Sequence, residues 1–205
     1  MRMMAVIRIF QSRKEEMVNM IATLLFSLQM MAGLFLLLLG GVGFIQDKRF
    51  FSSAPAQTQA VVPASKPERF PGQHAVGWVM ILLAFAFMGG AIVLGAWDGI
   101  QNGFGFWQFA LRFFAMLMLL KAFDVLFFDW YLLCNAGLNF FPHFYPETKA
   151  VLGRHLFGYN RKTHLLHILL FPVASVALAW ICTLPSVSCG NGKTLAAGFQ
   201  SRGRL

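Results

Sequence analysis

Long uninterrupted runs of apolar residues dominate the chain, and they lack the spacing of a half-buried helix or strand. Four runs stand out, at about residues 17–45, 75–97, 106–134 and 164–184. A bilayer core about 30 Å thick requires roughly 20 apolar residues in a spanning helix. The pattern therefore predicts an all-α membrane protein, a bundle of four transmembrane helices that forms a single domain over residues 1–184.

Three segments between and after these runs are polar enough to lie outside the membrane. Residues 46–74 contain four prolines and many small polar residues. Such a segment cannot bury enough apolar surface to fold alone, so we expect a mobile loop. Residues 136–163 form a second loop, rich in aromatic and basic residues, in which Pro142 and Pro146 prevent a long helix. Residues 185–205 are polar and glycine-rich, which predicts a disordered tail.

The composition supports a membrane protein and changes the meaning of the net charge. Hydrophobic residues make up 58% of the chain and charged residues 12%, against about 25% charged in a soluble domain. The net charge of +9 would suggest nucleic acid as a partner of a soluble protein. Here the basic residues lie between the apolar runs, where they meet lipid headgroups. We expect the lipid bilayer as partner and no nucleic acid, with other membrane subunits or self-association left open.

Small residues mark where helices approach each other or end. Gly40, Gly41 and Gly43 are expected to loosen the end of the first run. Ala91 and Gly95 have the spacing that lets two helix backbones come close. Residues 98–105, DGIQNGFG, are expected to form a tight turn. Four spans place both ends of the chain on one side of a membrane, and a bacterial cell membrane is the favoured location.

Charges interrupt the third run, in the stretch KAFDVLFFDWYLLCN. A charge at the centre of a bilayer costs about 2.5 to 3.5 kcal/mol. Lys121 and Asp124 are three residues apart, so they share a helix face and can pair. We therefore predict a buried ion pair, with a proton, ion or substrate path through these groups as the alternative. Arg112, nearer the start of the run, is expected to extend its stem to the membrane interface.

A candidate polar cluster forms where the third run ends and the fourth begins. These ends share one membrane side, so Asp129 lies at the level of His164 and His167. At about 100° per residue, Asp124 and Asp129 flank one broad helix face and do not stack. Two carboxylates and two imidazoles can bind a divalent metal. The HxxH pattern is short, however, and histidines that bond to headgroups or helix ends are favoured over metal ligands.

No catalytic motif is visible in the sequence, which has no GxSxG, P-loop or GxGxxG pattern. The favoured function is a small multi-pass membrane protein without its own catalysis, a partner subunit or packing component. The alternative is a membrane enzyme or an ion or proton transporter that uses Asp124, Asp129, His164 and His167. The sequence does not decide whether the chain is an enzyme, and it indicates no particular substrate, cofactor or metal.

Overall fold

Helices make up almost all of the described chain. The computed structural model describes the backbone of residues 2–51, 56–133, 140–151 and 161–200, and the side chains of residues 13–50, 57–132, 140–151 and 162–184. The elements in order are α1 (Arg2–Leu38), η1 (Leu39–Ile45), η2 (Lys48–Phe51), α2 (Ala56–Val61), α3 (Gln73–Gln101), α4 (Phe106–Phe123), η3 (Asp124–Leu133), α5 (Phe140–Phe144), η4 (Pro146–Ala150) and α6 (Arg161–Gln200). η1 and η3 are π-helical continuations of α1 and α4, and η2 and η4 are short 3-10 helices. The described residues contain no strand.

Three helices are long and apolar enough to cross a membrane. They cover Arg13–Ile45, Gln73–Gln101 and Lys162–Leu184. Large apolar side chains on them face outward, with Leu82 67% and Leu169 71% exposed. A soluble monomer rarely exposes a contiguous apolar surface of this extent. The prediction of a helical membrane protein is confirmed to this degree.

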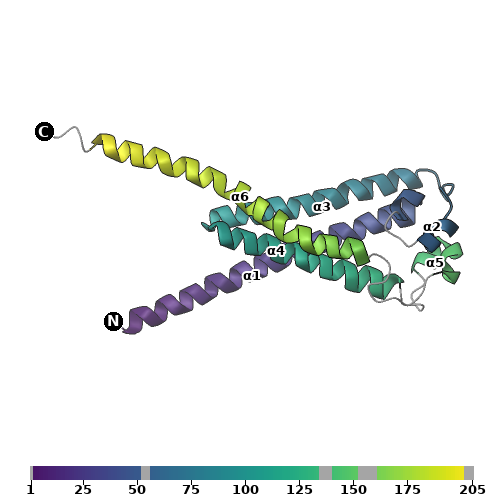
Figure 1. Ribbon diagram of the computed structural model, residues 1–205, viewed down its shortest axis with the longest axis horizontal. Helices are drawn as coiled ribbons and strands as arrows, with labels where there is room; N and C mark the ends of the chain where they lie inside the picture. Colours follow the sequence, from purple (N-terminus) through teal and green to yellow (C-terminus); the bar gives the residue numbers. More distant parts are fainter. Residues whose placement is uncertain (1, 52–55, 134–139, 152–160, 201–205) are drawn as a thin grey trace.

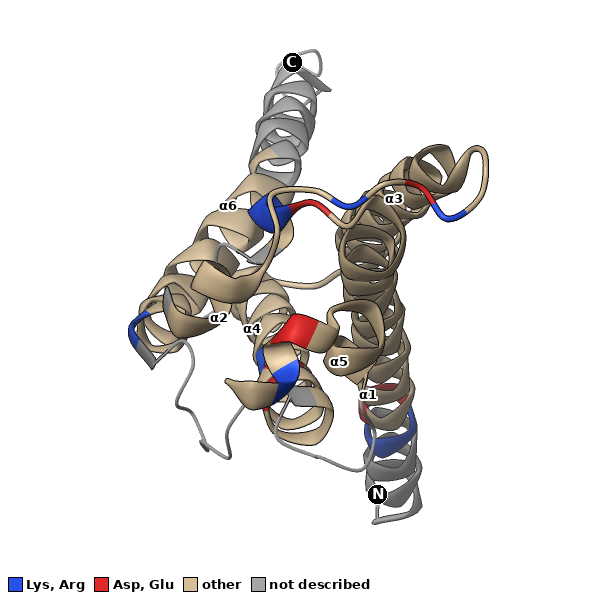
Figure 2. Cartoon of the chain, turned by 90° about the vertical axis from the view of Figure 1, so that its right-hand side faces the viewer, with Lys and Arg blue, Asp and Glu red and all other residues tan. Residues whose placement is uncertain are grey.

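The long helices lie alongside each other, and α4 runs beside α6 (Figure 1). α1 packs along α3, α4 packs along α6, and α1 also contacts α4. The connections that contain α2 and α5 lie together at one end, and α1 begins and α6 ends towards the other (Figure 1). Figure 2 looks onto the end with α2 and α5, where charged residues gather in the connections while the long helices are mostly uncharged. This division matches a structure with an apolar middle and polar ends.

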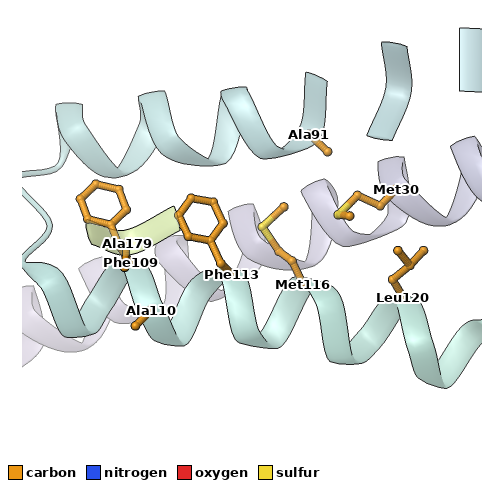
Figure 3. Packing of buried hydrophobic residues seen from close by; sticks show 8 residues of the cluster. All are labelled: Met30, Ala91, Phe109, Ala110, Phe113, Met116, Leu120 and Ala179. Carbon is orange, nitrogen blue, oxygen red and sulfur yellow. The ribbon is translucent and has the colours of Figure 1, made fainter. Parts of the chain in front are cut away.

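The main apolar core is built around α4. Its buried residues are Met30, Ala91, Phe109, Ala110, Phe113, Met116, Leu120 and Ala179. Phe109, Phe113 and Met116 point from α4 towards α1 and α3, and each is 1% exposed (Figure 3). The rings of Phe109 and Phe113 stack with their centres 6.2 Å apart. α4 is therefore held by contacts on several sides, although it also carries charged residues.

Glycines bring α1 and η1 close to α3. A Cβ atom added at Gly33 would lie 2.9 Å from the backbone oxygen of Ala84, and one at Gly40 would lie 3.0 Å from the backbone oxygen of Gly77. Only glycine leaves room for two backbones at this distance. The expectation that Gly40, Gly41 and Gly43 loosen the end of the helix stays a prediction. The α-helix changes to a π-helix at Leu39, and the three glycines are buried there. Gly40 faces α3, whereas Gly41 faces Phe50 and Gly43 faces Phe144.

The turn between α3 and α4 is shorter than predicted. α3 continues through Gln101, so the first half of the expected turn at residues 98–105 is helical. Gly103 has a φ of 66° and supplies the left-handed residue that reverses the chain. Asp98 and Gly99 stay in the helix because both contact α4, as described below.

The two connections opposite the start of α1 pack on each other. We call the described parts of residues 46–72 and 140–151 the cap. Val62 is 3% and Tyr145 0% exposed, and both belong to a second apolar cluster with Phe128 of η3. The first connection cannot fold alone, but the second connection and η3 supply the apolar partners that it lacks. The mobility of the first connection stays a prediction. Its described part nevertheless contains short helices and packs against the second connection, where the sequence predicts an open loop.

α6 is longer than the fourth apolar run. It continues to Gln200, across most of the segment that we expect to be a disordered tail. A helix that already exists can be extended without the cost of a new nucleus, which is the physical reason why a polar sequence continues it.

Candidate functional site

Four charged or imidazole side chains are buried in the described residues: Arg112, Lys121, Asp129 and His164. They fall into two groups. One lies at the turn between α3 and α4, and the other lies where η3 meets α6.

Arg112 is held inside the protein by an acidic partner on α3. Its Nη1 donates to Oδ2 of Asp98 at 2.6 Å and to the backbone oxygen of Gly95 at 3.0 Å. The guanidinium carbon lies 4.2 Å from the centre of the Phe104 ring, in a cation–π contact. The side chain is 2% exposed, so the expectation that it reaches to the interface is wrong. The sequence is compatible with this pair, because Asp98 begins the predicted turn and Arg112 follows the turn in the next helix.

Lys121 and Asp124 lie where their spacing predicts. Nζ of Lys121 donates to Oδ2 of Asp124 at 2.6 Å. The lysine side chain is 7% exposed and the aspartate side chain 30%. The carboxylate thus stands between the buried ammonium and the outside, and it compensates a charge that would be costly to bury alone.

Asp129 and His164 connect η3 to α6. Oδ2 of Asp129 lies 2.7 Å from Nε2 of His164, and the two side chains are 12% and 8% exposed. The atoms meet at this distance without the straight alignment of a hydrogen bond, so the contact is one of proximity and charge. Nδ1 of His164 is buried and has no hydrogen-bond partner among the described residues. The sequence predicts that Asp129 and His164 lie at the same level of the bundle, and in the structure they are in direct contact.

The π-helical geometry of η3 changes how its two aspartates are arranged. At the pitch of an α-helix they would point well apart, which is the arrangement expected from the sequence. In a π-helix the backbone bonds close over five residues, so residues five positions apart stand about one turn apart. Asp124 and Asp129 therefore lie towards the same side, and each is within electrostatic reach of the other.

His167 completes the group at this place. It is half-buried and stacks on Phe171, with ring centres 5.5 Å apart. It is within electrostatic reach of Lys121, Asp124 and His164. The residues of this group, which we call the α4–α6 cluster, are Lys121, Asp124, Asp129, His164 and His167. Of the four residues of the predicted polar cluster, Asp129 and His164 are in direct contact, and Asp124 and His167 lie within electrostatic reach. The function of the group stays a prediction.

The part of the chain that the structure describes contains no set of side chains that could bind a metal ion. No group of three or more His, Cys, Asp or Glu side chains is placed there to hold a metal ion. Asp129 and His164 alone supply two donor atoms, fewer than the three or four protein ligands that zinc sites use. We assign no metal or cofactor to the cluster.

A second polar group, in the cap, was not visible from the sequence. Nζ of Lys66 donates to the backbone oxygen of Phe144 at 3.0 Å and to Oε2 of Glu147 at 3.2 Å, and it lies 4.5 Å from the centre of the Tyr145 ring. The pKa of Glu147 is lowered by a hydrogen bond from its own backbone N–H and by Lys66. Burial raises the pKa of Tyr145 above its usual range. At neutral pH the ion pair that joins the two connections is therefore formed.

Replacing Lys66 with alanine is expected to loosen the cap. The change removes a charged donor to a backbone oxygen and to a carboxylate, a loss of about 1 kcal/mol for a partly exposed group. Limited proteolysis of the purified protein should then cut the first connection several times faster. Lys149→Ala in η4, an exposed lysine, is the control. Equal cleavage rates for the two variants would contradict this role for Lys66.

Comparisons with protein-family models, with curated proteins and with solved structures give no match to this chain. The function is therefore argued from the helices and the charged groups themselves. Three apolar helices of spanning length fit a helical membrane protein.

Proposed function

We propose that the chain is a small integral membrane protein with four spans, and that it acts as a partner subunit or packing component without its own catalysis. The fourth span would be α4 with η3, which have 18 and 10 residues. At about 1.5 Å per residue they are roughly 40 Å long, enough to cross a core of about 30 Å. α4 also packs along α6 and against α1, two helices of spanning length.

One observation carries the non-catalytic part of this proposal. Both cations of α4 are paired within the chain, Arg112 with Asp98 and Lys121 with Asp124. Such pairing compensates both charges and reduces their cost among apolar helices. Nε and Nη2 of Arg112 are buried and have no hydrogen-bond partner among the described residues. The outward apolar faces of the long helices are then available to lipid or to neighbouring subunits.

The number of spans can be tested with single cysteines in a variant that lacks the three native cysteines. Suitable exposed positions are Lys14, Ala64, Asn102 and Lys149. With four spans, a membrane-impermeant maleimide should label positions 14 and 102 from one side of the vesicle and positions 64 and 149 from the other. If α4 with η3 does not cross, position 149 should be labelled from the same side as position 102. That result would refute the four-span proposal.

A membrane enzyme or an ion or proton transporter is the second candidate function. The observation that favours it is the convergence of Asp124, Asp129, His164 and His167 from two helices, with Asp129 and His164 buried. Ion or proton flux into liposomes that contain the purified protein separates the two candidates. If the wild type shows flux and Asp129→Asn loses it, with unchanged amounts of folded protein, the protein is a transporter and the packing role is refuted.

A further inference from the structure

Beyond this packing role, we propose that Asp129 and His164 form a buried binding site for one proton, and that the bound proton holds η3 against α6. The inference depends on the contact and its burial and does not require a fourth membrane span. The ligand of the α4–α6 cluster is then a proton, and the contact between η3 and α6 depends on pH.

The geometry supplies the first argument. Oδ2 of Asp129 and Nε2 of His164 lie 2.7 Å apart, close enough for a charge on one group to act directly on the other. Both side chains are at least 88% shielded from solvent, so water does not satisfy them as it would at the surface. Each residue belongs to a different helical element. The state of this pair therefore affects how η3 and α6 fit together.

The charge of the cluster supplies the second argument. Lys121 contributes one positive charge, and Asp124 and Asp129 contribute two negative charges. With both histidines neutral, the cluster carries one net negative charge. A buried charge without a counterion is costly, and one added proton removes it. The proton can reside on the imidazole beside a carboxylate or on the carboxyl beside a neutral imidazole, and in both forms the cluster is neutral.

The π-helical turn supplies the third argument. It places Asp124 and Asp129 towards one side, where like charges repel each other. Lys121 lies 2.6 Å from Asp124 and compensates that carboxylate first. Asp129 is left with His164 as its nearest partner. The second negative charge is therefore compensated by one proton, bound to Asp129 or to His164.

The nearest further cation on α6 is Lys162, two residues before His164, and its side chain is exposed. Lys121 faces the pair from α4, Asp124 from η3 and His167 from α6. α1 and η1 contain no charged residue from Met17 to Ile45. In α5, His143 is exposed. Among the described residues, the balance of charge thus depends on the protonation of Asp129 and His164.

Release of the proton should weaken the contact between η3 and α6. The folded cluster would then keep a net negative charge among apolar side chains, a penalty that the unfolded chain does not have. Below about pH 6.5 a histidine of the unfolded chain also binds a proton, so the stability of the folded state should fall as the pH rises above that value. The expected fall in Tm is at least about 3 °C for a protein of this size.

The test is the thermal stability of the detergent-purified full chain from about pH 5 to about pH 8. The Tm of the wild type should fall with rising pH. Asp129→Asn should reverse the slope, because the cluster is then neutral with a neutral His164 and positive when the imidazole is protonated. The exposed His143→Gln is the control and should keep the wild-type slope. A flat wild-type profile, or a wild-type slope in Asp129→Asn, would overturn the proposal.

If Asp129→Asn does not fold, NMR spectroscopy of the wild type provides an independent test. In protein labelled with ¹⁵N-histidine, the signal that disappears in His164→Gln reports on this imidazole. In the wild type it should change over the same pH interval in which Tm falls. The carboxyl signal of Asp129 is followed in the same way in protein labelled with ¹³C-aspartate. If the imidazole and carboxyl signals both stay constant over that interval, the proposal is overturned, whatever the number of membrane spans.

Discussion

Replacing Asp98 with alanine is expected to lower the free energy of unfolding by about 3 kcal/mol, the largest effect predicted for this chain. The substitution leaves the guanidinium of Arg112, whose side chain is 2% exposed, with the backbone oxygen of Gly95 as its remaining acceptor. A buried charge that loses its counterion costs far more than an exposed one. The free energy can be measured by denaturant titration in mixed micelles.

Two matched variants separate the loss of the partner from the loss of the interaction. Asp98→Leu combined with Arg112→Met removes both charges and should be within about 1 kcal/mol of the wild type, because replacing a whole buried pair is often neutral. Asp47→Ala removes the contacts with the side chain and backbone N–H of Arg49, whose side chain is 82% exposed, and should cost much less than Asp98→Ala. If Asp98→Ala is no more damaging than Asp47→Ala, Arg112 is not as isolated from solvent as described.

Gly99→Ala is expected to have the second largest effect, a loss of about 1 to 3 kcal/mol. The new Cβ would lie 2.3 Å from Cε1 of Phe109, closer than two carbon atoms can approach. The ring cannot move away easily, because Phe109 is 1% exposed and packs between Phe104 and Phe113. The substitution should therefore separate α3 from α4 near their turn.

Gly89→Ala, in the same helix, is the control. A Cβ at Gly89 would meet no atom within 4 Å. Alanine is the better helix former, so this variant should be unchanged or gain up to about 1 kcal/mol. The resistance of both variants to thermal unfolding in one detergent gives the comparison. Equal stability of the two would mean that the Phe109 ring repacks without cost.

The parts of the structure that the sequence predicts depend on local pattern. The apolar runs predict the long helices because burial of apolar surface extends over whole segments, and their bounds differ from the structure mainly at polar ends such as Gln101. The contact of Lys121 with Asp124 follows from a spacing of three residues in any helix. The proximity of Asp129 to His164 follows from chain topology, since consecutive helices meet at one level.

The remaining features depend on contacts that no local pattern encodes. The partner of Arg112 lies 14 residues away across a turn, so the sequence alone equally permits an exposed arginine. The π-helical closure of η3 is set by packing, and the arrangement of Asp124 and Asp129 changes with it. The cap required two connections that are each unable to fold alone, and Lys66 joins them over 81 residues of sequence to Glu147.

The glycine contacts between α1 and α3 have a mechanical consequence. Gly33 of α1 and Gly40 of η1 are seven residues apart, as are Gly77 and Ala84 of α3, and the two pairs meet in antiparallel order. A shift of either helix by one turn would bring a side chain to a point where only a hydrogen atom fits. These two helices should therefore move as one rigid half of the molecule. We expect changes in helix position to occur instead between α6 and the α4–η3 segment. Those elements meet through Asp129 and His164, side chains that can change their charge.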